Sequence, residues 1–304
     1  MKLINFYILM VQIGRKIAIT YNDETYMLKF NTEKKGVYYN ASISEYVSCK
    51  ILKELGFNVQ DVILGTYNGE KVVACKIFSD NDNVLNDFAS IKNSYSYKPG
   101  SNGYGIELNE VLETIEDQNI IDKNKLLEHF WEMFILDSLL ANFDRHNGNW
   151  GFLINQKEGI VKIAPIFDCA SCLYPALSEE KMQEFIEDKE EKEIKERVFI
   201  FPNSAIKIDN LKINYQLYIN SLENKDLNNA LISIFNKIDI NKINNCIDNL
   251  VISNIRKNFY KKMINARYTY IIKSAYQKLE YLNEISKNNK IEENTQSDDD
   301  ELEL

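Results

Sequence analysis

Two aspartates and one asparagine bracket a short stretch of the chain, NFDRHNGNWGFLINQKEGIVKIAPIFDC, residues 142–169. Asp144 and Asn149 precede a first apolar segment, GFLIN, and Asp168 follows a second one, IVKIAPIF. Because a polar turn at 156–159 separates the two segments, they predict a β-hairpin. Asn149 and Asp168 then lie together at its open end, and Asp144 lies on the loop that leads into its first strand.

This arrangement predicts phosphoryl transfer. An amide oxygen and a carboxylate at one hairpin mouth suit Mg²⁺, which binds one or two carboxylates together with substrate phosphates. A nearby carboxylate that does not bind the metal, here Asp144, can accept the proton of a hydroxyl. Protein kinases use the same layout: an Asp base, an Asn five residues later, and a metal-binding Asp after a hairpin. We therefore expect ATP and Mg²⁺ as cofactors.

Phosphoryl transfer of this kind also needs a strand lysine for the ATP phosphates and a helix acid to position it. Lys29 in YMLKF is the only charged residue of its short apolar strand, and Glu45 lies in the first turn of the next predicted helix. Taken singly, Lys29 is explained as a surface lysine and Glu45 as part of a capping box with Ser42. Beside the Asp-Asn-Asp pattern, in kinase-like order, we favour the nucleotide-binding role for both.

The elements that must position Lys29 and Glu45 form a small sheet with one helix. Hairpin signals join strands at 17–21 and 26–30, and Asn68-Gly69 joins two later strands, VILGTY and KVVACKIF. Between the hairpins, SISEYVSCKILKELGF has apolar residues at helical spacing, and Gly56 supplies the stop. We expect this N-lobe, the nucleotide-binding sheet and helix, to occupy residues 1–79.

The rest of the chain predicts a mostly helical C-lobe over residues 80–286. Residues 93–107 are rich in Ser, Gly and Tyr and predict a loop, whereas residues 124–140 predict a buried helix and residues 222–286 several amphipathic helices. The fold class is therefore α+β, with the bilobal architecture of protein kinases. The acidic residues 287–304 predict a disordered tail.

The composition of the chain indicates which classes of partner and which cellular compartment to expect. The formal net charge is −9, but residues 291–304 carry seven acids and no base, so the body is nearly neutral and offers no basic footprint for direct nucleic-acid binding. No apolar run reaches the length of about 20 residues needed for a membrane span. The N-terminal LINFYILMVQI resembles a signal segment but lacks a small-residue cleavage site, so we interpret it as a strand. We expect a cytoplasmic protein.

The five cysteines are an odd number and favour reduced thiols over a disulfide framework. Cys169 and Cys172 form a C-x-x-C pair. A redox role needs a thioredoxin-like context, and a zinc site needs two further ligands at close spacing. With only two histidines and no second C-x-x-C in the chain, we favour small buried cysteines.

Three stretches carry a family resemblance: YMLKF, SEYVSCKILKELGFNVQDVILGTYNGEKVVACKIF and LLANFDRHNGNWGFLI…IAPIFDCASCLYP. Together they resemble the HipA-like atypical serine/threonine kinases, most closely their proinflammatory, cell-translocating members. The resemblance covers about residues 13 to 176 well and the helical remainder loosely. It implies transfer of the γ-phosphate of ATP to Ser or Thr hydroxyls of a protein substrate, including the chain itself, in the role of a toxin or secreted effector.

The resemblance also implies a role for each matching residue. Lys29 binds the α- and β-phosphates with Glu45 as its partner, and the backbone of the stretch 74–78 faces the adenine. Asp144 is the catalytic base. Asn149 and Asp168 are the candidate metal ligands. The candidates for adenine binding are Ala74, Cys75, Lys76 and Phe78. His146 is a further catalytic candidate, which we expect to order the loop by hydrogen bonding rather than to bind a ligand.

Two departures from the family pattern affect these expectations. The glycine-containing segment over the phosphates is reduced to QIGRK, in which Gly14 stands alone beside Arg15 and Lys16. The backbone amides and side chains of these three can still contact phosphates. After Asp168 the chain has Cys-Ala-Ser instead of Phe-Gly, so conventional activation-loop switching does not follow.

Other functions stay open at this point. D-R-H-x-x-N followed by a metal-binding Asp is also found in phosphoinositide kinases, but the acid-rich segment 178–192 favours a neutral or basic protein substrate over an anionic lipid. A non-catalytic ATP-binding pseudokinase is the second alternative, favoured only by the short glycine segment. HipA-like toxins often act with a DNA-binding antitoxin, and nothing in this sequence indicates such a partner.

Overall fold

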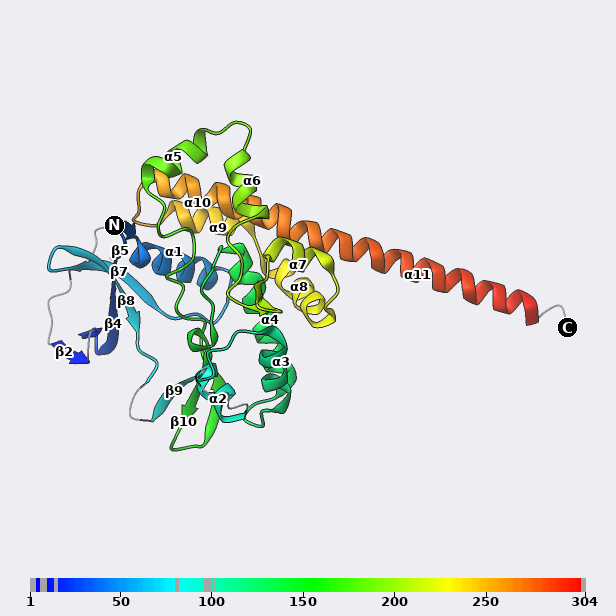
Figure 1. Ribbon diagram of the computed structural model, residues 1–304, viewed down its shortest axis with the longest axis horizontal. Coiled ribbons are helices and arrows are strands. Elements are labelled where there is room, and N and C mark those ends of the chain that lie inside the picture. The colour runs from blue at the N-terminus through cyan, green and yellow to red at the C-terminus, as the bar shows by residue number, and fades with distance from the viewer. Residues whose placement is uncertain are drawn as a thin grey trace.

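The computed structural model describes residues 4–5, 10–13, 16–79, 82–95, 100 and 102–301, and the side chains of residues 17–79, 82–95, 100 and 102–289. A β-rich N-terminal lobe packs against a larger, mostly helical C-terminal part (Figure 1). The predicted α+β, bilobal fold class is therefore confirmed.

The N-terminal lobe is built on a six-stranded sheet with the order β1-β7-β8-β4-β3-β2. The turn residues of its two predicted hairpins have positive φ, as in tight two-residue turns: Asn22 and Asp23 at 50° and 62°, and Asn68 and Gly69 at 49° and 82°. The strands are β1 (Ile4–Asn5), β2 (Met10–Ile13), β3 (Lys16–Tyr21), β4 (Glu24–Phe30), β7 (Val62–Tyr67) and β8 (Glu70–Lys76). Both predicted hairpins are confirmed.

Helix α1 (Ala41–Glu54) lies on this sheet, as predicted. Val47 and Ile51, one turn apart, are fully buried, and the chain leaves the helix at Gly56, whose φ of +85° favours glycine. We missed a small hairpin between β4 and α1, formed by β5 (Thr32–Lys34) and β6 (Val37–Tyr39). Its two strands have only three residues each, and nearly all of them are exposed, so they show no alternation of buried and exposed residues.

The hairpin predicted between Asn149 and Asp168 is part of a three-stranded sheet with the order β11-β10-β9. The predicted pair is confirmed as β10 (Gly151–Asn155) and β11 (Ile160–Ile163), although β11 ends two residues before Pro165. The third strand, β9 (Asn83–Asp87), was not predicted, since its short, polar-ended sequence has its partner far along the chain. Helix α2 (Phe88–Tyr95) follows β9, so the predicted loop at 93–107 begins too early.

Helix α4 (Lys123–Leu139) is the central element of the C-terminal part and confirms the predicted buried helix. Trp131 and Ile135 are fully buried on it. The Trp150 ring, at the start of the hairpin, stacks on Phe88 with ring centroids 4.0 Å apart. One hydrophobic cluster contains buried residues of both lobes, from Ile51 of α1 to Phe134 of α4. The lobes therefore share a continuous core behind the hairpin.

The predicted helices of the C-terminal region are confirmed. Asn224, Asp239 and Ser253 cap three of them by accepting backbone N–H groups of the first turn. The remaining elements are α3 (Leu108–Asp117), α5 (Glu179–Glu187), α6 (Lys192–Phe199), β12 (Lys207–Ile208), β13 (Leu211–Lys212), α7 (Tyr215–Ser221), α8 (Lys225–Lys237), α9 (Ile240–Asp248), α10 (Asn254–Arg267), a π-helical segment (Tyr268–Lys273) and α11 (Ser274–Glu301).

Helix α11 projects away from the body of the molecule (Figure 1). We expected a disordered tail at 287–304, but the backbone is helical to Glu301. The helix continues from buried residues such as Ile272 and Ala275, so its first turns are anchored and the later ones extend from them. Among the helices that the structure describes, none is long and apolar enough to cross a membrane.

Candidate active site

Lys29, Glu45 and Asp168 meet where the two lobes join. The Lys29 Nζ atom lies 3.0 Å from Glu45 Oε2 and 2.9 Å from Asp168 Oδ1. Strand β4 supplies Lys29, α1 supplies Glu45, and the loop after β11 supplies Asp168. Lys29 therefore bridges two carboxylates from different elements, whereas its own sequence context is equally typical of a surface lysine.

Burial and charge act in opposite directions on this trio. Burial alone would lower the pKa of Lys29, but the Glu45 and Asp168 carboxylates outweigh it and raise that pKa well above its usual range. Glu45 is fully buried, and this burial raises its pKa even though Lys29 acts to lower it. Asp168 has 39% of its side chain exposed. The Asp168 carboxylate is thus partly open to solvent.

Asp168 has a strained backbone. Its φ is +57°, in the left-handed region, which costs a non-glycine residue about 1–3 kcal/mol. Arg145 holds the chain in place just before it by donating from Nη1 to the Phe167 carbonyl. Strain that is retained by surrounding contacts is typical of residues whose side-chain direction matters for function.

Arg145 links the hairpin mouth to the buried helix α4. Its guanidinium donates to both carboxylate oxygens of Asp137, at 2.9 and 3.1 Å, and both residues are buried. Its Nη1 donates to the Asn149 carbonyl as well as to that of Phe167. A single nitrogen thereby holds together the start of β10 and the residue before Asp168, the two ends of the predicted hairpin.

The loop that carries Asp144 is ordered by its own polar groups. Asn142 donates to Asp137 at 2.8 Å, and its side-chain oxygen accepts the Asp144 N–H at 3.1 Å. His146 Nδ1 accepts the Gly148 N–H at 3.1 Å, and its ring makes an edge contact with Tyr104. The Asp144 side chain itself is exposed. His146 thus makes a loop-ordering hydrogen bond of the kind expected for it.

The Asn149 side chain is fixed by a hydrogen bond to the loop that carries Asp144. Its side-chain nitrogen donates to the Asp144 carbonyl at 2.9 Å, which turns the amide oxygen away from that contact. One amide oxygen and one carboxylate fit Mg²⁺ when water and phosphate oxygens complete its shell. In the part of the chain that the structure describes, no group of three or more His, Cys, Asp and Glu residues could hold a metal ion. With one amide oxygen and one carboxylate, Asn149 and Asp168 have the donor types that a Mg²⁺ ion shared with a phosphate substrate would need.

The stretch predicted to face the adenine begins inside β8. Ala74 and Cys75 are buried in the sheet, and Lys76 forms an ion pair with Glu24. The Lys76 N–H donates to the Asp61 carbonyl, and the Lys76 carbonyl accepts from Gln60, so its backbone polar groups are already engaged. Phe78 follows, and its ring makes an edge contact with that of Phe167, 5.9 Å away.

The predicted phosphate-contacting segment is only partly covered. Gly14 and Arg15 lie outside the described residues, and the backbone of Lys16 begins β3, opposite Ile13. Sequence reasoning also missed Asp137 and Asn142, which support the loop. Asp137 carried a signal, because it is the one charged residue within the apolar run FILDSLL.

The cysteines are free thiols, as predicted. Cys49, Cys75, Cys169 and Cys172 are buried, whereas Cys246 is half-buried. Cys169 Sγ lies 3.7 Å from an Arg145 nitrogen, and Cys49 Sγ lies 3.9 Å from Glu45 Oε1. Hydrogen bonds from Cys172 and Cys49, aided by Arg145, hold the pKa of Cys169 well below its usual range.

Comparison of the sequence with known proteins identifies the family of this chain. Residues 11–232 match the model of the HipA-like C-terminal domain, so the chain belongs to that family. The sequence is 44% identical to the serine/threonine-protein kinase CtkA of Helicobacter pylori over 269 residues, covering 86% of this chain and 82% of that protein. The predicted family and the predicted enzyme class, a serine/threonine-protein kinase, are confirmed by this likeness.

Comparison with solved structures supports the same family. The crystal structure of the Helicobacter pylori proinflammatory kinase CtkA matches with a TM-score of 0.84 and 41% identity, over 92% of this chain and 99% of that one. The HipA protein of a Shewanella oneidensis toxin–antitoxin system, solved with HipB and operator DNA, matches with a TM-score of 0.53. At 13% identity, over 88% of this chain and 64% of that one, this second likeness shows the fold alone.

Proposed function

We propose that the chain is an ATP- and Mg²⁺-dependent protein kinase that transfers the γ-phosphate to Ser or Thr hydroxyls of a protein substrate. The observation that carries this is the Lys29 contact with both Glu45 and Asp168. A lysine fixed between a helix acid and a metal-binding aspartate is what positions the ATP phosphates in kinases. The similarity to a serine/threonine-protein kinase over most of both chains supports the same function.

In this proposal each polar residue has one task. Lys29, held by Glu45, binds the α- and β-phosphates. Asp144, exposed at the end of an ordered loop, accepts the proton of the substrate hydroxyl as that oxygen attacks the γ-phosphorus. Asn149 and Asp168 would hold Mg²⁺, and a bound Mg²⁺ would supply positive charge against the phosphates.

Arg145 and His146 act as positioning residues. Arg145 fixes the Asn149 and Phe167 backbones to buried Asp137, which sets the spacing of the two metal ligands. His146 orders the loop through the Gly148 N–H. Since phosphoryl transfer depends mainly on positioning and electrostatics, such contacts contribute to rate without touching substrate.

We place the adenine against the chain that follows β8. Because the Lys76 N–H and carbonyl and the Ile77 N–H already have backbone or side-chain partners, the Ile77 carbonyl and the Phe78 N–H are the groups we assign to the adenine edge. This narrows the predicted stretch 74–78 to its last residues. Gly14, Arg15 and Lys16 remain candidates for phosphate contacts.

Self-phosphorylation and a role as a toxin or effector belong to the same proposal, and they rest on the family resemblance. The proinflammatory character named for the similar Helicobacter pylori kinase belongs to that protein. We propose action on a protein in the cytoplasm, of the producing cell or of a host cell after translocation.

A lipid-kinase function is tested in the same experiment. Purified protein is incubated with Mg²⁺ and γ-labelled ATP, with a generic protein acceptor in one reaction and phosphatidylinositol vesicles in another. We expect label on protein, and no label on either acceptor with Asp168→Ala. Label on the vesicles alone would favour the lipid kinase, and ATP binding without any transfer would favour a pseudokinase.

A further inference from the structure

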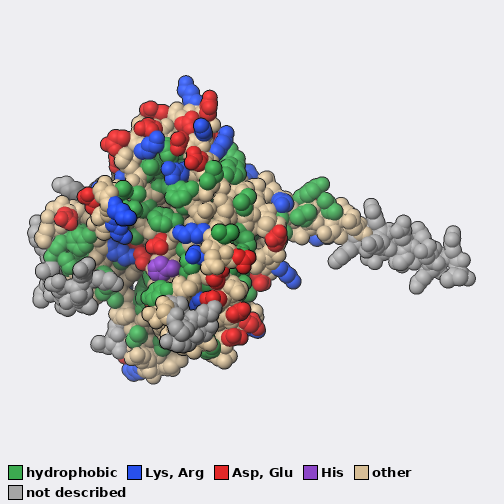
Figure 2. All heavy atoms as spheres, viewed as in Figure 1, with side chains coloured by type: hydrophobic (Ala, Val, Ile, Leu, Met, Phe, Trp, Pro, Cys, Tyr) green, Lys and Arg blue, Asp and Glu red, His purple; other side chains and the backbone are tan. Residues whose placement is uncertain are grey.

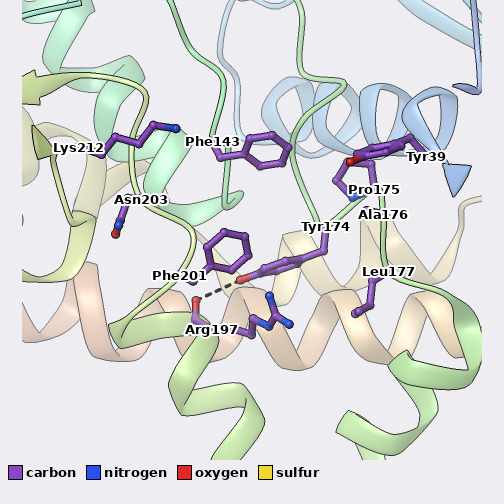
Figure 3. Close-up of a pocket in the computed structure, with 10 residues that line it drawn as sticks. All are labelled: Tyr39, Phe143, Tyr174, Pro175, Ala176, Leu177, Arg197, Phe201, Asn203 and Lys212. Atoms are coloured by element: carbon purple, nitrogen blue, oxygen red, sulfur yellow. Dashed lines mark hydrogen bonds between the residues drawn. The ribbon is translucent and has the colours of Figure 1, made fainter. Parts of the chain in front are cut away.

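A pocket of about 440 Å³ lies beside the loop that carries Asp144 (Figure 3). Phe143, the residue before Asp144, lines it, and the rings of Tyr174 and Phe201 face the same space. Lys29, Glu45 and Asp168 are not among its lining residues. The pocket is therefore a second space, next to the proposed base and separate from the phosphate-binding trio.

The segment that lines one side of this pocket, residues 174–177, is held in an unusual conformation. Leu173 and Tyr174 have φ values of 54° and 57°, and each such non-glycine residue costs about 1–3 kcal/mol. The Leu173 N–H donates to Leu140, the Tyr174 hydroxyl donates to the Arg197 carbonyl, and the Pro175 carbonyl accepts from Asn40. Contacts from both lobes thus keep the pocket wall in one shape.

Two basic side chains line the same pocket. The Arg197 guanidinium lies over the rings of Tyr174, Phe185 and Phe201, with its carbon 5.8, 5.6 and 5.1 Å from their centroids. Lys212 is exposed on β13, and its side chain runs toward Phe143 (Figure 3). Within the described ranges neither residue forms an ion pair with a carboxylate. The pocket therefore combines apolar walls with two positive charges that are available to a ligand.

The chain that leads to Phe201 in the pocket wall is apolar and exposed. Phe199, Ile200 and Phe201 are consecutive and have 37%, 63% and 46% of their surface exposed. Exposed apolar groups that adjoin a pocket are typical of surfaces that bind another polypeptide. A ligand that uses both features has an apolar side chain and an acidic group close together.

We propose that this pocket binds the protein substrate beside its acceptor hydroxyl, taking one large apolar side chain against Phe143, Tyr174 and Phe201. An Asp or Glu of the same substrate segment is held by Arg197 and Lys212. Since an extended chain advances about 3.3–3.6 Å per residue, residues within a few positions of a hydroxyl at Asp144 reach the pocket. This inference rests on the proposed kinase function and adds the substrate class.

The proposal replaces our expectation of a neutral or basic substrate. That expectation came from the acids of segment 178–192, but Glu179 pairs with Arg256, and Glu184 pairs with Lys181. Over α5 and α6 acidic and basic side chains are interspersed (Figure 2). The charges that line the pocket next to Asp144 are instead both positive.

The test is an oriented peptide library with one fixed Ser acceptor, in which each of four positions on either side is varied in turn. Wild-type protein, Mg²⁺ and labelled ATP should select Leu, Met or Phe at one position and Asp or Glu at a neighbouring one. We expect about a tenfold higher kcat/KM for the selected peptide than for its Ala-substituted or Lys-substituted versions.

Three variants assign the preference to the pocket. Ala176→Trp fills it from an exposed position and should abolish the apolar preference. Lys212→Glu should abolish the acidic preference, and the exposed position of Lys212 keeps the effect on folding small. Lys242→Glu is the matched control, a charge reversal at an exposed lysine on α9 that does not line the pocket, and it should select as the wild type does.

Failure of this inference is distinguishable from failure of the proposed function. Equal phosphorylation of all library members by an active wild-type protein would overturn the pocket assignment and leave the kinase function intact. Selection that is unchanged in both Ala176→Trp and Lys212→Glu would do the same. If neither peptide nor protein is phosphorylated, or only phosphatidylinositol vesicles are, the proposed function fails, and the pocket assignment fails with it.

Discussion

Lys29 and Asp168 are 139 residues apart in the chain, and their side chains form an ion pair of 2.9 Å across the two lobes. The contact joins β4 of the N-terminal lobe to the loop after β11 of the C-terminal part. It joins the predicted phosphate-binding lysine to the predicted metal ligand. The two residues that the proposed function assigns to ATP and to Mg²⁺ are therefore in direct contact.

The first prediction concerns Lys29. Lys29→Met should lower kcat/KM for peptide phosphorylation about 100-fold or more, because it removes a charge that stabilises the transferring phosphoryl group. Lys53→Met, at an exposed α1 lysine paired with Asp61, is the control and should retain activity. Steady-state kinetics with labelled ATP measures both. Equal activity of the two variants would show that Lys29 does not bind phosphate.

The second prediction concerns the buried pair of Asp137 and Arg145. Asp137→Asn leaves the guanidinium buried without its counter-charge and should lower the free energy of unfolding by about 3–5 kcal/mol. Glu184→Gln, which breaks the exposed pair with Lys181, should cost at most about 1 kcal/mol. Urea unfolding followed by circular dichroism measures both. A shared midpoint for the two variants would contradict the supporting role of Asp137.

The third prediction concerns metal binding. Asn149→Ala removes the proposed oxygen ligand and the donor to the Asp144 carbonyl, and should raise the Mg²⁺ concentration for half-maximal activity about tenfold. Asn241→Ala, at an exposed asparagine of α9, is the control. Titration of activity with Mg²⁺ at saturating ATP gives the comparison. An unchanged Mg²⁺ requirement in Asn149→Ala would exclude Asn149 as a ligand.

The fourth prediction is a pH dependence of stability. Burial lowers the pKa of His129 from 6.5 to about 4, and Arg145 adds to the effect against an opposing contribution from Glu132. Between those two values the unfolded chain binds more protons at this site than the folded chain, so the free energy of unfolding falls as the pH falls. The full contribution, at most about 3 kcal/mol, is present above pH 7 and is lost toward pH 4.

Comparison with His129→Gln isolates this effect from the titration of carboxylates. Between pH 7.5 and 5 the wild type should lose more stability than the variant, as measured by urea unfolding at each pH. Parallel loss in the two proteins would show that His129 titrates alike in the folded and unfolded states.

The β10–β11 hairpin, the two N-lobe hairpins and α4 could be predicted from the sequence, because turn residues and apolar periodicity are local signals. Strand β9 and the β5–β6 hairpin could not, because short polar strands are recognised only by their partners. The helical course of residues 287–301 was missed for a related reason, since an acidic composition indicates exposure and does not exclude a helix anchored at its start.

In the candidate site, too, some residues could be predicted from local sequence signals and others could not. Asp144, Asn149 and Asp168 stood out by their spacing around the hairpin, and Lys29 by being the one charge on its strand. The buried support from Asp137 and Asn142 depends on tertiary contacts that spacing does not encode. The pocket beside Phe143 could not be predicted either, because its lining residues come from five separate parts of the chain.

The most direct test of the central claim compares wild type with Asp144→Asn in two measurements on the same samples. Binding of a fluorescent ATP analogue reports the nucleotide site, and single-turnover transfer of labelled phosphate to a Ser peptide reports the chemistry. We expect Asp144→Asn to bind the analogue as tightly as wild type. Its rate of phosphate transfer should be lower by a factor of about 100 or more, because only the proton acceptor is lost. Transfer at the wild-type rate by Asp144→Asn would contradict the assignment of Asp144 as the base and the kinase mechanism built on it.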